Sequence, residues 1–162
     1  MLRFPFERLS RLSDILMLDS EATGFLTGCS SIYLIGCAYY EDGDLKLRQW
    51  FAQTPDEESE ILSAFLAFAE PYSYLIHYNG NTFDLPLLRK KADKYGIAYT
   101  LSSKKGLDIF RRITPYKNFL KLPDCKLKTI ESFLGIHRED IYTGGQLIQV
   151  YHDYTSSHDY DL

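Results

Sequence analysis

Residues 14–25 read DILMLDSEATGF, and this stretch decides how the rest of the chain is interpreted. Its apolar first half has the length of a buried strand. Asp19 and Glu21 stand at the far end of that strand. Because side chains two residues apart in a strand point to the same face, the pattern places two like charges side by side. Such a pair repels and resists desolvation, so a compensating group is expected beside it.

Outward from this stretch, the pattern predicts three strands, a helix, a fourth strand and then helices. Asp42-Gly43 gives a hairpin turn between the second and third strands. The period then changes, and Pro55 stands at the first position of a helix that stops before Pro71. The predicted strands are 14–21, 30–43, 44–53 and 72–80, and the predicted helices are 54–70, 84–96, 106–113, 125–135 and 144–154.

This order of elements resembles the ribonuclease-H-like α/β fold, with a central mixed sheet of three antiparallel strands plus parallel strands, flanked by helices. In such folds, sites form at the carboxyl ends of the central parallel strands. Asp19 and Glu21 lie at that end of the first strand, and Asp84 follows the fourth. The topology therefore predicts that these three carboxylates converge.

Composition favours one domain over residues 1–162, with residues 1–12 as an N-terminal arm. No apolar run is long enough for a membrane span, and Cys29, Cys37 and Cys125 form no CxxC pair. We therefore expect three buried thiols and a cytoplasmic protein without a membrane partner.

Residues 1–81 hold 12 Asp and Glu against 5 Lys and Arg, whereas residues 88–128 hold 12 Lys and Arg against 3 Asp. Such a cationic region beside an acidic centre suits a polyanionic substrate, although a solvated surface alone also produces this bias.

A second stretch, HYNGNTFDLPLL at residues 77–88, carries Asn79, Phe83 and Asp84 directly after a predicted strand. Asn79-Gly80 also suits an ordinary turn, and Asp84 an ordinary helix cap. Several oxygen ligands around one pocket suit Mg²⁺ or Mn²⁺, whereas zinc would require His or Cys. A pair of such ions can clamp the attacking and leaving oxygens of phosphoryl transfer.

Both stretches resemble motifs of the DEDD 3′–5′ exonuclease superfamily. LDSEATGF is similar to the first motif, with Ala22 in place of the usual Thr, and YNGNTFDLPLL is similar to the second motif as it occurs in family B polymerase proofreading domains. The later segment CKLKTIESFLGIHRED, followed by GGQLIQVYHDY, resembles the bacterial YprB-type ribonuclease-H-like domain. This resemblance covers roughly residues 12–160.

The resemblance implies a metal-dependent 3′–5′ exonuclease that hydrolyses terminal phosphodiesters of single-stranded DNA or RNA with two ions, Mg²⁺ or Mn²⁺. Asp19 and Glu21 would bind the catalytic ion, and Asp19 would bridge to a second ion held by Asp84. The partner would be the 3′ end of a single strand. Thr23 and the Gly24 backbone would touch the terminal nucleotide, and Asn79 and Phe83 would shape the pocket, with Phe83 closer to a core residue than to a base-stacking one.

The third motif of that superfamily, Tyr-x-x-x-Asp or His-x-x-x-x-Asp, has no match up to Leu162. Three interpretations follow: the chain ends before this motif, another residue replaces the fourth carboxylate, or the domain is inactive. We favour the first. Asp108 is the candidate substitute and possible accessory residue, although it also suits the cap of its own helix. His152, Asp153, His158, Asp159 and Asp161 are expected to be solvated residues of the last helix and tail.

Two rival functions remain. A catalytically impaired ribonuclease-H-like domain, lacking the fourth carboxylate, would bind nucleic acid without cutting it. The pattern Asp19-x-Glu21-x-Thr23 also resembles haloacid-dehalogenase-type phosphatases, in which the first acid is a nucleophile. That second alternative leaves YNGNTFDLPLL without a role.

Overall fold

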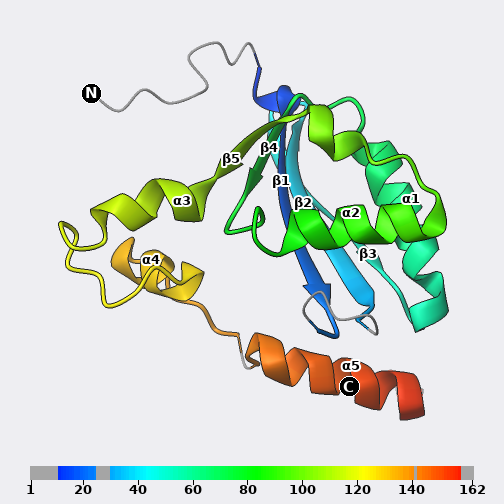
Figure 1. The fold of residues 1–162 in the computed structure, drawn as a ribbon. Helices are drawn as coiled ribbons and strands as arrows, with labels where there is room; N and C mark the ends of the chain where they lie inside the picture. Colours follow the sequence, from blue (N-terminus) through cyan, green and yellow to red (C-terminus); the bar gives the residue numbers. More distant parts are fainter. Residues whose placement is uncertain (1–10, 25–29, 141, 158–162) are drawn as a thin grey trace.

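The computed structural model describes residues 11–24, 30–140 and 142–157, so most of the predicted N-terminal arm and Cys29 lie outside the described residues. Its centre is a five-stranded sheet in the order β3-β2-β1-β4-β5 (Figure 1). β1 pairs antiparallel with β2, and β2 with β3, whereas β4 runs parallel to both β1 and β5. The strands are β1 (Ile15–Ala22), β2 (Ile32–Glu41), β3 (Asp44–Phe51), β4 (Tyr74–His77) and β5 (Lys105–Asp108). The predicted mixed sheet is therefore confirmed.

The helices also follow the predicted order. They are α1 (Glu58–Ala69), α2 (Asp84–Tyr95), α3 (Ile109–Ile113), α4 (Leu127–Phe133) and α5 (Gly144–Ser157). The described residues also contain four short 3-10 helices: Leu12–Asp14, Pro55–Glu57, Thr100–Ser103 and Thr114–Tyr116. α2 ends at Gly96, whose φ of 66° suits glycine because it carries no Cβ. The hairpin turn at Asp42-Gly43 has positive φ at both residues, as a two-residue turn between twisted strands requires.

One prediction was wrong. Residues 106–113 were expected to form a helical piece, but residues 105–108 form β5 and only Ile109–Ile113 form α3. β5 is four residues long and pairs with β4 from Tyr74↔Lys105 to His77↔Asp108. A strand this short has too few residues for a period to be read, and its partner strand determines its conformation.

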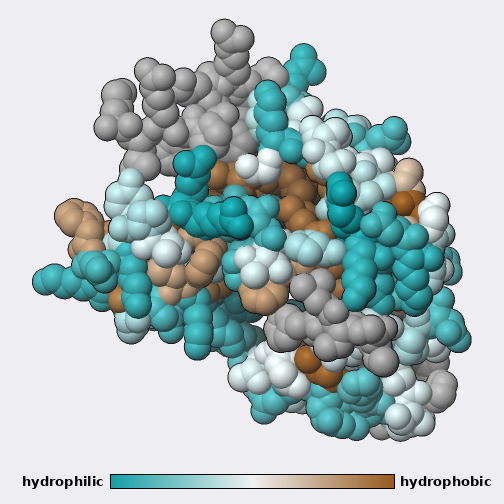
Figure 2. All heavy atoms as spheres, in the orientation of Figure 1, coloured by the Kyte–Doolittle hydropathy of each residue, from teal (hydrophilic) through white to brown (hydrophobic). Residues whose placement is uncertain are grey.

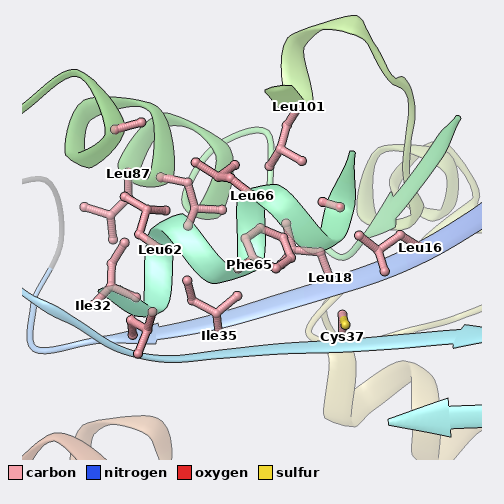
Figure 3. Packing of buried hydrophobic residues seen from close by; sticks show 14 of the residues in the cluster. Leu16, Leu18, Ile32, Ile35, Cys37, Leu62, Phe65, Leu66, Leu87 and Leu101 are labelled. Carbon is pink, nitrogen blue, oxygen red and sulfur yellow. The ribbon is translucent and has the colours of Figure 1, made fainter. Parts of the chain in front are cut away.

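α1 and α2 cover one face of the sheet and bury the core against it. Phe65 and Leu62 of α1 are fully buried, as is Leu88 of α2. Figure 3 shows side chains of β1 and β2 pointing toward those of α1, among them Leu16, Leu18, Ile35, Cys37, Leu62, Phe65 and Leu66. Cys37 and Cys125 are buried free thiols, as predicted.

The other face of the sheet is partly covered by α5. Tyr151 of α5 stacks on Tyr33 with 4.3 Å between ring centroids and meets Phe51 edge-on at 6.0 Å. α3 and α4 project beyond β5 (Figure 1). We call residues 109–136, which include both helices, the α3–α4 lobe. Among the described residues, no helix has the length and apolar character that crossing a membrane requires.

Candidate active site

The site is built where the end of β1 meets the start of α2. Asp19 and Glu21 point to the sheet face opposite Leu18, and Asp84 is the first residue of α2. The hydroxyl of Ser20, between the two β1 acids, donates a hydrogen bond of 2.5 Å to Asp84 Oδ1. Asp84 is 8% exposed, and Asp19 is open to solvent. The fold therefore brings Asp84 to Ser20, the residue between Asp19 and Glu21, across 64 positions of sequence.

Burial and neighbouring negative charges shift the pKa values of Asp19 and Glu21. Burial raises the pKa of Asp19, and the charge of Asp84 raises it further. Burial also raises the pKa of Glu21, with additional contributions from Asp19 and Asp84. Arg138 is the cation whose charge acts in the opposite direction on the pKa of Asp19. Excess negative charge at the end of a strand is the condition under which a bound cation stabilises a protein.

The chemistry of these donors fits a hard divalent cation, because every candidate ligand is a carboxylate oxygen. The positions of the carboxylate side chains fit a bound cation less well. Within the described part of the chain, no group of three or more His, Cys, Asp or Glu side chains stands close enough together to hold a metal ion. Asp84 Oδ1 instead accepts the hydrogen bond from Ser20. The donors therefore suit Mg²⁺ or Mn²⁺ in kind, and their side chains would have to rotate to bind one.

A cavity of about 240 Å³ lies beside the carboxylates. Four predicted site residues line it: Glu21, Gly24, Phe83 and Asp84. Its opposite wall is the beginning of α5, with Gly144, Gly145 and Ile148. Asp19 and Glu21 also line an adjoining hollow of about 370 Å³ on the open face of the sheet. Phe83 is 41% exposed, so its interpretation as a core residue was wrong, and its side chain is available to the cavity.

Thr23 is held by the strand pair that leads into the cavity. Its backbone N–H donates to Ser31 O at 2.9 Å, and its Oγ1 accepts from Ser31 N at 2.9 Å. The hydroxyl proton of Thr23 can still be donated to a ligand. Thr23 therefore fixes the position of Gly24, which lines the cavity.

Asn79 lies in the turn between β4 and α2 with a φ of 60°, a conformation that Asn tolerates. Its N–H donates to Asp108 Oδ1 at 2.9 Å, and Gly80 N–H donates to His77 Nδ1 at 3.1 Å. A Cβ at Gly80 would lie 2.8 Å from the ring of His77, so only glycine fits without displacement. Asn79 lines neither hollow described above, and its observed contacts are those of the turn.

Asp108 stands at the end of β5 and caps α3, accepting from Arg111 N at 3.4 Å. The capping role expected for it is confirmed. Its Oδ2 lies 3.8 Å from His77 Nδ1 and 3.7 Å from Arg111 Nε. Burial lowers the pKa of His77, and its Nδ1 accepts a hydrogen bond, so His77 is neutral with its proton on Nε2.

Several residues at the site escaped the sequence analysis. Ser20 fills the variable position of the first motif, yet it is the direct link to Asp84. Arg138 and Gly144 come from a part of the chain that the two motifs do not cover. On α5, Asp153 accepts from Gln149 Nε2 at 2.8 Å and is exposed, as expected. His158, Asp159 and Asp161 lie outside the described residues.

A mixed sheet with acids at the end of its first strand and at the start of the helix after its fourth is the arrangement expected of a ribonuclease-H-like domain. The chain belongs to the RNase_H superfamily, whose family description matches residues 16–162. The ribonuclease-H-like superfamily expected from the motifs is thereby confirmed. The haloacid-dehalogenase alternative has no support from this membership.

The relatives are longer proteins. A DNA polymerase of Thermococcus hydrothermalis is 26% identical over an alignment 163 positions long, which covers 84% of this chain and 10% of the polymerase. The family B DNA polymerase of the hyperthermophilic archaeon Pyrobaculum calidifontis has a TM-score of 0.70 at 15% identity, covering 89% of this chain and 21% of that one. The zinc-bound E. coli ExoI–ssDNA complex has a TM-score of 0.59 at 12% identity, covering 87% and 39%. The chain therefore spans less than half the length of each of these relatives, and the structural likenesses show a shared fold.

Proposed function

We propose that this domain is a metal-dependent 3′–5′ exonuclease acting on the end of single-stranded DNA or RNA. The observation that carries the proposal is the position of Asp84. Asp84 accepts a hydrogen bond from Ser20 at the end of β1. The charge of Asp84 also contributes to the raised pKa values of Asp19 and Glu21 at the edge of a cavity. A structural role for three acids would pair them with cations, as the fold does elsewhere.

Asp19, Glu21 and Asp84 would hold the metal. When bound, a pair of Mg²⁺ or Mn²⁺ ions stabilises the attacking and leaving oxygens of the phosphodiester. Ser20 restrains Asp84 Oδ1, so it sets the orientation from which Asp84 turns toward an ion. Asp108 acts indirectly, because it holds the turn that precedes Asp84 through Asn79 N–H.

The terminal nucleotide would occupy the cavity between β1, α2 and α5. Gly24 allows close approach of a backbone, and the partly exposed ring of Phe83 presents an apolar surface to a base or sugar. Asn79 would act on this cavity by shaping the turn before Phe83.

The test is release of nucleotides from a 5′-labelled single strand, supplied once as DNA and once as RNA. We expect stepwise shortening from the 3′ end with Mn²⁺ or Mg²⁺, no shortening with EDTA, and none from Asp19→Ala. Glu60→Ala is the matched control, since Glu60 is an exposed acid of α1 outside both hollows. Equal shortening by the chain and by Asp19→Ala would refute the proposal.

A second candidate is a nucleic-acid-binding domain that has lost the chemistry. The observation in its favour is that the described acids do not form a complete group of metal ligands. This candidate predicts that the chain binds the labelled strand but releases no nucleotide with either metal. A longer chain that supplies a fourth carboxylate would then restore release only if the first proposal is correct.

A further inference from the structure

Two adjoining hollows run along α4 on the α3–α4 lobe. The first, of about 480 Å³, is lined by residues that include Lys121, Lys128, Ser132 and Phe133. The second, of about 270 Å³, shares Lys128 and Ser132 with the first and continues to Arg138. Lys128 and Ser132 lie one turn apart on α4, so the two hollows flank the same stretch of this helix. We call the two hollows together the α4 groove and define it by Lys121, Lys128, Ser132, Phe133 and Arg138.

The α4 groove leads toward the carboxylate site. Arg138, at its far end, lies in the segment between α4 and α5. α3 and α4 stand beside the edge strand β5 in Figure 1, and the chain runs from α4 to α5, whose first residues wall the cavity. A ligand lying in the groove would therefore have one end at Arg138, in the segment that leads to the cavity wall at Gly144.

The groove carries three cations and one aromatic ring that reach solvent. The side chains of Lys128 and Arg138 are 56% and 42% exposed, and Phe133 is 53% exposed. Lys121 is exposed and has no ion pair with any carboxylate of the described residues. Over this lobe, teal hydrophilic and brown hydrophobic residues lie side by side (Figure 2). Cations interleaved with an exposed ring are what a single strand requires, because phosphates pair with the cations and a base stacks on the ring.

The anionic neighbours of these cations are few. Asp140 pairs with Lys128 at 2.7 Å and with Arg138 at 3.0 Å, and Glu131 pairs with Arg138 at 3.2 Å. Because Asp140 pairs with both cations, it holds Lys128 and Arg138 close together on the same side of the groove. A row of phosphates can replace Asp140 because it offers several negative charges at once.

We propose that the α4 groove binds the backbone of single-stranded nucleic acid on its way to the carboxylate site. Lys121, Lys128 and Arg138 contact successive phosphates, and Phe133 stacks on a base. The inference rests on the proposed exonuclease function for its direction, but binding in the groove does not require hydrolysis. An acidic protein surface is the competing occupant, and it would not need the ring of Phe133.

The experiment measures binding of a fluorescent single strand, as oligothymidylate and as oligouridylate, in EDTA so that no hydrolysis occurs. Lys128→Gln and Arg138→Gln should each weaken binding and reduce the steepness of log Kd against log salt by roughly 0.7. Phe133→Ala should weaken binding roughly 5- to 150-fold, with little change in salt dependence. Circular dichroism of each variant confirms that it is folded.

Two matched controls come from the same chain. Lys46→Gln removes an exposed lysine of the β2–β3 hairpin, and Phe119→Ala removes a ring that is 84% exposed on the lobe but lines neither part of the groove. Both should bind like the parent. Losses in the controls equal to those in the groove variants would overturn the inference, as would equal displacement of the strand by polyglutamate.

The outcomes separate the two proposals. If groove variants weaken binding but the parent releases no nucleotide with Mn²⁺ or Mg²⁺, the groove is correct and the exonuclease function is not. If the parent releases nucleotides and the groove variants bind normally, the exonuclease stands and the groove is refuted.

Discussion

A buried ion pair between α1 and α2 holds the core of the fold together, and removing one of its partners is expected to destabilise the protein. Glu58 of α1 is 0% exposed, and Lys91 of α2 is 5% exposed. Lys91 Nζ lies 2.8 Å from Glu58 Oε1 and 2.9 Å from Oε2, and it donates to the carbonyl of Ser30. Ile32 N–H donates to Oε1 at 2.7 Å, and Tyr95 Oη donates to Oε2 at 2.5 Å. One carboxylate thus joins two helices to the start of β2.

Lys91→Met removes the charge and keeps most of the volume. Glu58 would then be buried with hydrogen bonds from Ile32 and Tyr95, and its remaining cation would be the exposed Lys94, whose Nζ lies 3.9 Å from Oε2. Breaking such a pair from one side destabilises a protein by about 3–5 kcal/mol, because an uncompensated charge stays buried. Total stabilities are about 5–15 kcal/mol, so this variant should lose a large part of the free energy of unfolding.

Urea denaturation of the parent and of Lys91→Met measures this loss directly, and hydrogen exchange at the Ile32 amide should lose protection in step. Lys46→Met is the matched control, because Lys46 pairs with Glu41 on the protein surface. Solvent-exposed ion pairs contribute little to the free energy of unfolding. It should leave the urea midpoint unchanged. A loss below about 1 kcal/mol for Lys91→Met would show that Glu58 does not depend on Lys91, and the reasoning would be refuted.

Four further outcomes are expected. The folded state raises the pKa of Asp19, so in the absence of divalent cations its contribution to stability falls as pH rises through the raised value. Asp19→Asn removes this charge and should therefore raise the thermal midpoint at neutral pH in EDTA. The pKa of His77 is lowered from 6.5, so stability should fall as pH drops below 6.5 toward the folded value, as a pH series of urea midpoints would show. Gly80→Ala should lose about 1–3 kcal/mol in urea, because its Cβ would lie 2.8 Å from the ring of His77. Ser20→Ala frees Asp84 Oδ1, and its nuclease rate should fall below that of the parent while strand binding is retained; an unchanged rate would contradict the role given to Ser20.

Long elements with a clear period were predictable from the sequence, and short ones were not. α1 and α2 have apolar positions at helical spacing over twelve residues each, and β2 and β3 flank a turn whose two residues adopt positive φ. β5 was missed because its four residues adopt an extended form through pairing with β4. No local pattern encodes a contact between residues thirty positions apart.

At the site, the motifs identified the acids but not what holds them. Asp19, Glu21 and Asp84 were predictable as candidates because the first two stand at the carboxyl end of a strand, the third follows another strand, and the topology brings these strand ends to the same edge. The link through Ser20 was not, since serine in a strand has many unremarkable uses. The exposure of Phe83 was likewise hidden, because an aromatic residue before a helix is usually buried.

The fold handles the negative charge of its carboxylates in two contrasting ways. Glu58 is surrounded by a lysine, a tyrosine hydroxyl and a backbone amide, so its charge is compensated within the protein. Asp19 and Glu21 lie against Asp84 and have raised pKa values, so their charge is left uncompensated by neighbours of comparable strength. A chain able to place Lys91 beside Glu58 could also have placed a lysine beside Asp19. The missing stabilisation at the end of β1 is therefore a property of the site, and a cation bound there would supply it. If Asp19→Asn leaves the thermal midpoint in EDTA unchanged, this contrast has no energetic basis.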